Sequence, residues 1–427
     1  MNKPTVGYAG MTHLGLCSAI GGASKGFDMV CFDADAALVE RLTAGQLPVV
    51  EPDLDDMLRD NRARISFTAD AAGLKACDLV YVAPDVPTDD SGTSDLAGLD
   101  RLLELVLANT RPDAVVVVLS QVPPGFTRAR QRPGRLLYYQ VETLVFGRAV
   151  ERVTQPERYI VGVAEPGQPL PPAFDTFLKA FGCPILPMRF ESAELTKIAI
   201  NCCLVASVST ANTLAEICEN IGADWTEIVP ALKLDRRIGQ YSYLAPGLGI
   251  AGGNLERDLA TIVRLGEQYS TDVGVVRAWQ HNSRYRRDWV LRTLRNRVLN
   301  GAPDATLAVL GLAYKENTHS TKNSPSLALL AAIPQARVRA FDPVVAPKPE
   351  WHPRLTGTSS ALEACDGAEA LVIVTPWPQF KALAPADIAR HLRGRIVIDP
   401  YKCLDQAACR AAGLEHVSLG VATFETG

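Results

Sequence analysis

Residues 5–20 of the chain read TVGYAGMTHLGLCSAI. They start with a short apolar run, and two glycines, Gly10 and Gly15, come between this run and an apolar pattern of helical type. A strand, a glycine turn and a helix in this order are typical of the first unit of a doubly wound parallel sheet. In such a unit the amides at the helix N-terminus point toward the pyrophosphate of a dinucleotide. The stretch therefore predicts a cofactor turn formed by Gly10, Thr12, His13, Leu14 and Gly15.

An acidic residue follows the second apolar run, Met29–Phe32, which we interpret as the second strand. This residue, Asp33, comes about 20 residues after Gly10, the spacing at which a carboxylate accepts hydrogen bonds from the adenosine ribose and repels a 2′-phosphate. Thr12 stands where the usual fingerprint has its middle glycine. The glycine turn and the carboxylate of Asp33 together predict NAD rather than NADP as the cofactor.

Further short β-branched runs continue the alternation of strands and helices, at Leu79–Val82 and Val115–Leu119. From Glu191 to about Gly222 the chain lacks proline and has apolar residues at helical spacing, which predicts one long helix. A second helical block is expected over residues 255–299. The strand pattern returns near Ala305, so the sequence changes from α/β to helical and back to α/β.

The order strand, glycine, helix, strand, aspartate occurs in both halves of the chain, with Gly10 and Asp33 in the first and Gly311 and Asp342 in the second. The sequence thus predicts an α/β protein with two Rossmann-like domains, each a doubly wound parallel sheet, joined by a helical central domain with a long central helix. The predicted domains cover residues 1–188 (NAD-binding Rossmann domain), 189–300 (helical central domain) and 301–427 (C-terminal Rossmann-like domain).

Length and composition exclude several classes of protein. The chain has 427 residues, more than one hydrophobic core usually holds. A net charge of −4 argues against nucleic acid or an anionic membrane as a partner. No apolar run reaches the ~20 residues that a membrane span needs, and the first residues lack the pattern of a secretory signal. Ten cysteines without metal-binding spacing predict reduced core thiols, no metal site and a cytoplasmic protein.

Ordered blocks across nearly the whole chain resemble the UDP-glucose/GDP-mannose dehydrogenase family. The blocks are Asp33-Ala34-Asp35, Glu51-Pro52-Asp53-Leu54, Ser120–Thr127, Glu191–Asn201, Arg237-Ile238-Gly239, Pro246–Asp258, and Gly311–Lys315 followed by Thr318 and Ser324-Pro325. The resemblance implies an NAD-linked oxidoreductase whose relatives oxidise the C6 alcohol of a nucleotide sugar to an aldehyde and then to a carboxylate. It also implies a homodimer formed through the central domain, and a C-terminal domain that holds the nucleotide diphosphate, expected to be UDP.

The resemblance assigns residues to the chemistry. Lys197 and Asn201, spaced i, i+4 on one helix face, match a pair that holds the reacting oxygen, where the ammonium would stabilise negative charge. Asp258 matches an aspartate that organises water or helps proton transfer. Ser120 is expected to contact the cofactor. The expected substrate contacts are Arg237, which would reach across a dimer interface, Gly252 and Lys315.

Three departures from the family pattern concern the second oxidation. Asn254 stands at the position of the catalytic cysteine, and an amide cannot attack an aldehyde to form the thiohemiacetal that the second hydride transfer uses. Phe146 replaces the second of two family glutamates, while the first is kept as Glu142 and is expected to order the site. Gln121 replaces a threonine of the same water network. We therefore predict a single two-electron oxidation of a nucleotide sugar, with Asn254 as a polar contact.

Three other functions stay open on the sequence alone. A redox-neutral isomerase or epimerase would oxidise a sugar carbon and return the hydride from retained NADH. A full UDP-glucose 6-dehydrogenase would reach the carboxylate by a cysteine-free route. A non-catalytic protein would bind NAD or a nucleotide sugar without turnover, although the retained Lys197, Asn201 and Asp258 have no evident use in such a protein.

Overall fold

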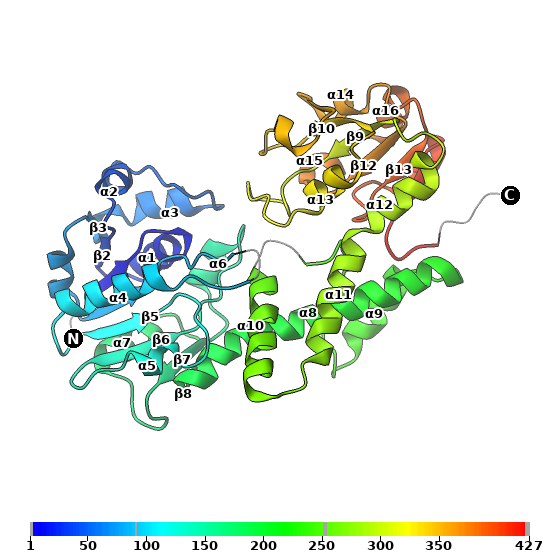
Figure 1. Cartoon of the computed structure of the whole chain (residues 1–427). Helices are drawn as coiled ribbons and strands as arrows, with labels where there is room; N and C mark the ends of the chain where they lie inside the picture. The colour runs from blue at the N-terminus through cyan, green and yellow to red at the C-terminus, as the bar shows by residue number, and fades with distance from the viewer. Residues whose placement is uncertain (1–2, 90–91, 251–253, 423–427) are drawn as a thin grey trace. The chain divides into compact units, whose positions relative to one another are not determined.

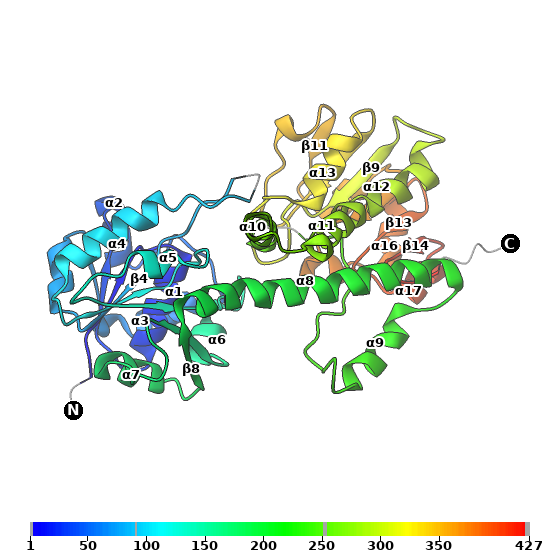
Figure 2. The same cartoon turned by 60° about the horizontal axis from the view of Figure 1, so that its bottom comes forward.

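The computed structural model describes residues 3–89, 92–250 and 254–422 (Figure 1). The chain divides into two compact units, Met1–Ile200 and Asn201–Gly427. The dividing point lies inside the long helix α8 (Phe190–Ile221), which Figure 2 shows as one continuous helix. The three predicted domains are a finer division and stay a prediction.

The first unit is built on an eight-stranded sheet with the strand order β3-β2-β1-β4-β5-β6-β7-β8. Its strands are β1 (Val6–Ala9), β2 (Met29–Phe32), β3 (Ile65–Thr68), β4 (Leu79–Val82), β5 (Val115–Val118), β6 (Leu136–Gln140), β7 (Tyr159–Val163) and β8 (Ile185–Arg189). Neighbouring strands run parallel except β6 and β7, which are antiparallel. The predicted parallel sheet is confirmed, with one antiparallel step added.

Helices cover both faces of this sheet. The helical segments of the unit are α1 (His13–Ser24), α2 (Ala36–Thr43), α3 (Leu54–Asp60), η1 (Arg62–Arg64), η2 (Ala71–Ala76), α4 (Ala97–Asn109), α5 (Phe126–Ala129), α6 (Ala149–Thr154) and α7 (Pro172–Lys179). Val115 and Val117 of β5 belong to the core shared with α1 and α7, whereas Val116 and Val118 belong to the core shared with α4. Side chains alternate between the faces of a strand, so this buried β-branched run forms a strand covered on both sides.

The second unit combines helices with a six-stranded parallel sheet of order β11-β10-β9-β12-β13-β14. The strands are β9 (Thr306–Leu310), β10 (Arg337–Phe341), β11 (Leu355–Gly357), β12 (Ala370–Ile373), β13 (Ile396–Ile398) and β14 (Glu415–Val417). The helices after α8 are α9 (Trp225–Leu234), α10 (Asn254–Tyr269), α11 (Gly274–Arg287), α12 (Trp289–Leu294), the π-helical turn η3 (Arg295–Leu299), α13 (Pro325–Ala332), η4 (Pro349–Trp351), α14 (Ala361–Cys365), α15 (Pro378–Lys381), α16 (Pro385–His391) and α17 (Gln406–Ala411). The second predicted helical block is therefore several helices, interrupted at residues 270–273 and at Asp288.

The two sheets repeat one local geometry after their first strands. Gly10 after β1 and Gly311 after β9 both have a φ of +95°, which glycine adopts without strain. Each glycine amide donates at 2.9 Å to the carbonyl that ends the second strand of its sheet. The amide of the next residue donates to the aspartate that follows, at 2.8 Å for Asp33 and 2.6 Å for Asp342. The repeated pattern predicted from the sequence is confirmed at the level of single hydrogen bonds.

Helix α8 is long and apolar enough, by length and composition, to cross a membrane, with a mean hydropathy of 1.5 over an 18-residue window. Sequence analysis expects no stretch of this kind, so α8 is an exception to that expectation. Three of its polar side chains, Glu194, Asn201 and Asn212, form hydrogen bonds to other groups of the chain. Internal hydrogen bonds of this kind are typical of a helix that packs within a protein.

Candidate active site

The turn after β1 has glycine where the backbone leaves no room for a side chain. A Cβ at Gly15 would lie 1.9 Å from the carbonyl oxygen of Gly10, and a Cβ at Gly10 would lie 2.9 Å from the backbone nitrogen of Pro84. The Met11 amide donates to Oδ2 of Asp33 at 2.8 Å, which ties the turn to the end of β2. Close backbone approaches of this kind are the reason for glycines in a dinucleotide turn.

Thr12 occupies the place of the middle glycine without blocking the turn. Its Oγ1 donates to the carbonyl of Ala83 at 3.1 Å, so the side chain points toward the end of β4. Thr12 is the N-cap residue of α1, and its side chain makes no capping hydrogen bond. The first amides of α1, on His13, Leu14 and Gly15, are therefore not taken up by this cap and fit the pyrophosphate of NAD.

The carboxylate of Asp33 is held by two backbone amides and remains partly exposed. Oδ2 accepts from Met11 and Oδ1 accepts from Asp35 at 3.0 Å. Because each carboxylate oxygen can accept more than one hydrogen bond, Asp33 can still receive ribose hydroxyls. Asp342 in the second unit is 7% exposed and accepts from four backbone amides and from Nε1 of Trp377. The two acids are therefore not equivalent, and Asp33 fits a cofactor role better.

His13 is held by a buried acid to which sequence analysis assigns no role. Nε2 of His13 lies 2.7 Å from Oε1 of Glu51, whose side chain is 1% exposed. The same carboxylate accepts from the amides of Gly147 and Ala149. The ring of His13 stacks on Phe146, with 4.3 Å between the ring centres. These hydrogen bonds and the stacked rings link the cofactor turn to the segment between β6 and α6.

Lys197 on α8 and Glu142 after β6 form a shielded ion pair. Nζ of Lys197 lies 2.7 Å from Oε1 of Glu142, and the two side chains are 14% and 17% exposed. Nζ also donates to the carbonyl oxygen of Glu142 at 3.2 Å, while Oε2 of Glu142 accepts from the Leu144 amide at 2.9 Å. An ammonium has three donors, so this arrangement leaves one for a third partner, as the predicted role at a reacting oxygen requires.

Glu194 on α8 positions the loop that follows β5. Glu194 is fully buried and accepts from the amides of Gly125 at 2.6 Å and Thr127 at 2.8 Å. Burial raises the pKa of Glu194, and the hydrogen bonds from these amides act in the opposite direction. Ser120, a predicted cofactor contact on the same loop, donates to the carbonyl of Pro84 at 2.5 Å and so joins the ends of β4 and β5. Sequence analysis does not single out Glu194, because nothing separates it from the other acids of α8.

In the second unit, Asn201 on α8 and Asp258 on α10 are hydrogen-bonded to each other. Nδ2 of Asn201 donates to Oδ2 of Asp258, and the two residues are 8% and 1% exposed. Nε of Arg257 lies 3.5 Å from the other carboxylate oxygen. Asp258 is thus held between an amide and a guanidinium, and it orients the amide of Asn201.

The thiol of Cys202 on α8 is unsuited to nucleophilic attack. Its side chain packs with the apolar cluster that contains Val205 and Leu259. Burial, together with the negative charge of Asp258, raises the pKa of Cys202 to about 11. Because the thiolate is the reactive form, this cysteine stays an inert thiol at neutral pH.

The remaining predicted residues are less closely engaged. Asn254 is the first residue of α10 and is exposed, while Gly252 lies outside the described residues. Arg237 pairs with Asp235 at 2.6 Å, and its side chain is 89% exposed. Lys315 lies in the segment after β9. Within the described part of the chain, no three His, Cys, Asp or Glu residues are grouped to hold a metal ion.

A glycine turn suited to a dinucleotide, a lysine held beside a carboxylate and a second Rossmann-like sheet define an NAD-dependent oxidoreductase with two nucleotide-binding folds. Models of one family match the chain in three parts: the NAD binding domain over residues 5–169, the central domain over residues 191–284 and the UDP binding domain over residues 308–406. The chain belongs to the UDP-glucose/GDP-mannose dehydrogenase family and is an NAD-dependent nucleotide-sugar dehydrogenase by class.

Individual relatives agree with this assignment. The UDP-glucose 6-dehydrogenase of Pseudomonas aeruginosa is 30% identical, over 96% of this chain and 96% of that protein. A UDP-glucose 6-dehydrogenase of Bacillus subtilis is 27% identical, over 97% of this chain and 93% of that protein. A solved UDP-glucose dehydrogenase from the archaeon Pyrobaculum islandicum is 27% identical and superposes with a TM-score of 0.81, covering 93% of this chain and 94% of that one.

Proposed function

We propose that this enzyme oxidises one alcohol of a nucleotide sugar, a UDP-hexose, to a carbonyl in a single two-electron step. The observation that carries the proposal is that α10 begins with the amide residue Asn254, the residue that the family resemblance aligns with a catalytic cysteine. The thiol of Cys202 cannot replace it, because burial raises its pKa to about 11. Without a thiolate, the carbonyl product cannot be captured for a second hydride transfer.

The residues assigned to the first oxidation support the proposal through their contacts. The turn of Gly10, Thr12, His13, Leu14 and Gly15 would hold NAD, which would supply a hydride acceptor, so that the substrate alcohol would become a carbonyl and release one proton. Lys197, directed by Glu142 at 2.7 Å, is assigned to the substrate oxygen, where its charge stabilises the developing negative charge. Asn201 is assigned to the same oxygen, and Asp258 with an associated water is assigned to the proton.

Two residues that the resemblance assigns to hydrolysis are replaced in this sequence, which supports the proposal. Phe146 has a phenyl ring where a second glutamate is expected, and this ring stacks on His13 of the cofactor turn. Gln121 replaces the threonine that the resemblance assigns to the water network of the second oxidation. A phenyl ring can neither accept a proton nor orient water, which supports a reaction that ends at the carbonyl.

We also propose a homodimer formed through α8. Leu214, Ile217 and Ile221 are 40%, 47% and 69% exposed and are spaced i, i+3, i+7, so they form one apolar stripe on the helix surface. The central domain of the family is the reason to expect a second copy on this stripe, and Arg237 would then reach the partner's substrate. All ten cysteines are unpaired, which suits the reducing cytoplasm that we propose as its compartment.

The number of NADH molecules formed per product tests the proposed reaction. NAD and a panel of nucleotide hexoses are incubated with the enzyme, NADH is followed by absorbance, and the product is identified by mass spectrometry. One NADH and a carbonyl product are expected. Two NADH and a carboxylate would show a cysteine-free route to the acid, a changed sugar without net NADH would show an isomerase, and no change across the panel would indicate a binding protein.

A further inference from the structure

Asn212 on α8 is a buried asparagine whose side chain binds a loop distant from it in the sequence. It is 1% exposed, and its Oδ1 accepts from the Gly247 amide at 2.8 Å. Asn201 lies about three turns earlier on the same helix, so the two side chains share one face of α8. Asn201 is bonded to Asp258 of α10. The chain is therefore held to this face of α8 both at Gly247 and at Asp258.

Helix α11 holds the same loop from a second side. We define the anchored loop as residues 244–250, which precede α10. The Ile250 amide donates to Oγ of Ser283 on α11 at 2.9 Å. Gly249 has a φ of +76°, and a Cβ added to it would lie 2.4 Å from the carbonyl oxygen of Ser283. The anchored loop therefore lies directly against α11, and glycine is required at the point of closest approach.

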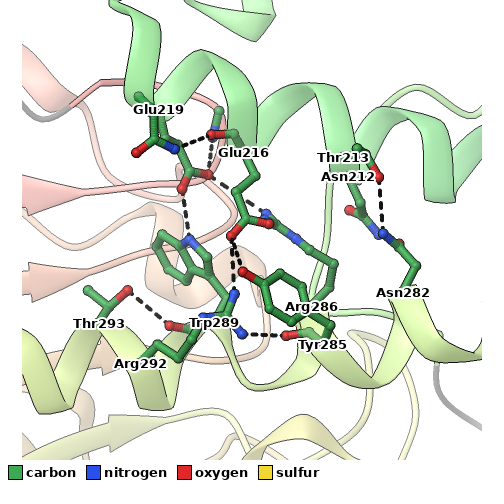
Figure 3. Close-up of polar contacts among 12 residues, drawn as sticks. Asn212, Thr213, Glu216, Glu219, Asn282, Tyr285, Arg286, Trp289, Arg292 and Thr293 are labelled. Atoms are coloured by element: carbon green, nitrogen blue, oxygen red, sulfur yellow. Dashed lines mark hydrogen bonds and ion pairs between the residues drawn. The ribbon is translucent and has the colours of Figure 1, made fainter.

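The two helices that hold the anchored loop are also bonded to each other. Nδ2 of Asn282 on α11 donates to Oγ1 of Thr213 on α8 at 3.0 Å. Figure 3 shows this bond together with further polar contacts between α11 and α8. Thr213 directly follows Asn212, and Asn282 directly precedes Ser283. The two anchors of the loop therefore stand on one connected pair of helices.

The anchored loop also reaches the edge of the second sheet where a nucleotide is expected. Leu248 is 2% exposed and belongs to the apolar core that contains the strands of this sheet. Burial raises the pKa of Tyr401, and a hydrogen bond with the Leu248 backbone acts in the opposite direction. Tyr401 follows the carboxyl end of β13, where its amide donates to Oδ1 of Asp399 at 3.3 Å. Ligands of open parallel sheets bind at the carboxyl ends of the strands.

We propose that Asn212 is a positioning residue that increases the affinity for the nucleotide sugar by holding the anchored loop at this edge. The choice of ligand rests on the proposed function. Because Asn212 is buried, it acts through the loop and not through a ligand contact of its own. Gly252, an expected substrate contact, follows the loop in the sequence, and Asn254 begins α10. The place of the anchored loop thus limits where the residues that follow it can lie.

Binding of UDP to the full-length protein, measured by isothermal titration calorimetry, tests the role of Asn212. Asn212→Ala removes the acceptor of the Gly247 amide, so the Kd for UDP should rise about two- to tenfold, the change that one ordinary hydrogen bond produces. Asn212→Asp keeps an acceptor oxygen in the same place and should restore the affinity. Asn220→Ala is the matched control, because Asn220 is an exposed residue of α8 that donates to the Glu216 carbonyl of its own helix. Its Kd should equal that of the unchanged protein.

Turnover separates positioning from stability. With a nucleotide hexose that yields NADH, Asn212→Ala should raise KM by the same factor as the Kd for UDP and leave kcat unchanged. A loss of folded enzyme would instead lower kcat and leave KM unchanged. UDP binding needs no turnover, so it tests the positioning role even if the single oxidation proves wrong.

Hydrogen exchange provides a test that needs no variant and decides the question if the Asn212 variants do not fold. A loop whose position helps UDP to bind must in turn be stabilised by UDP. In the unchanged protein, saturating UDP should therefore slow exchange at the amides of Gly247 and Ile250. An unchanged Kd in Asn212→Ala, or exchange that bound UDP does not slow, would overturn the positioning role alone. Absence of UDP binding by the unchanged protein would refute the proposed nucleotide and this inference with it.

Discussion

Nζ of Lys197 lies 2.7 Å from Oε1 of Glu142 and 3.2 Å from the carbonyl oxygen of the same residue. A carboxylate on a flexible side chain can follow an ammonium, whereas a backbone carbonyl cannot. Side chain and backbone of Glu142 together therefore give Lys197 a set direction. Groups held in a set direction contribute to catalysis because they need no reorganisation when the charge develops.

Removing the ammonium of Lys197 is expected to slow the chemical step without weakening the binding of NAD. In Lys197→Met, kcat should fall by about 10²- to 10³-fold, the usual loss when one stabilising donor is removed. The dissociation constant of NAD, measured by fluorescence titration, should stay unchanged. Lys179→Met is the control, because Lys179 is an exposed helix lysine paired with Asp175. A Lys197→Met enzyme with normal kcat would refute the role assigned to Lys197.

Cofactor choice is expected to depend on Asp33. In Asp33→Asn the negative charge that repels a 2′-phosphate is lost, while an oxygen remains for the Met11 amide. The ratio of kcat/KM for NAD to that for NADP should fall on the order of tenfold. Asp35→Asn is a matched control, because Asp35 caps α2 and asparagine is an equally good cap. Equal ratios in the two variants would contradict the prediction.

A thiol placed at position 254 is expected to trap the substrate. In Asn254→Cys an aldehyde product can add to the thiol, and loss of a second hydride to NAD then leaves a thioester on the enzyme. Hydrolysis should fail because Phe146 replaces the expected glutamate, so NADH forms in a burst of two per site and then stops. Intact-protein mass spectrometry should show the acyl adduct, and Asn254→Ser should show none. Steady production of a carboxylate by Asn254→Cys would show that hydrolysis does not need this glutamate.

Neighbouring cysteines on α8 are expected to differ in reactivity. Burial and the charge of Asp258 raise the pKa of Cys202 to about 11, so at pH 8 only about one thiol in a thousand is the reactive thiolate. Cys203 is exposed. Iodoacetamide at pH 8 should therefore alkylate Cys203 and leave Cys202 intact in peptide maps, and reaction at Cys202 should rise as the pH approaches 11. Fast alkylation of Cys202 at pH 8 would contradict its assignment as an inert thiol.

The sequence predicts the parts of the fold that are determined by residues close to one another along the chain. Gly10 and Asp33 are recognisable because a tight turn and the end of a strand impose strict local demands on residue type. The helix expected from Glu191 to about Gly222 is α8, Phe190–Ile221, because its apolar period persists over many turns. Local spacing thus specifies the cofactor turn and the helix that holds Lys197.

Partners that come from distant parts of the chain are not visible in the sequence. Glu51 and Glu194 look like ordinary surface acids, yet each is buried and binds backbone amides of a loop far along the chain. Arg286 likewise lies in a run of arginines on α11, and only packing against α8 shows that it alone is fully buried among them. Burial of a charged group depends on the tertiary structure, so local patterns do not reveal it.

The apolar stripe on α8 is expected to be an interface between two copies of the chain. Ile217 is 47% exposed at the middle of the stripe, so Ile217→Glu would place a charge in the proposed contact. Burying an unpaired charge is costly, and the variant should therefore sediment as a monomer. Its activity should fall, because Arg237 could no longer reach a partner's substrate. Val50→Glu, at an apolar residue 88% exposed in the first unit, should leave the sedimentation of the protein unchanged. If Ile217→Glu sediments like the unchanged protein, the second copy does not bind through this stripe.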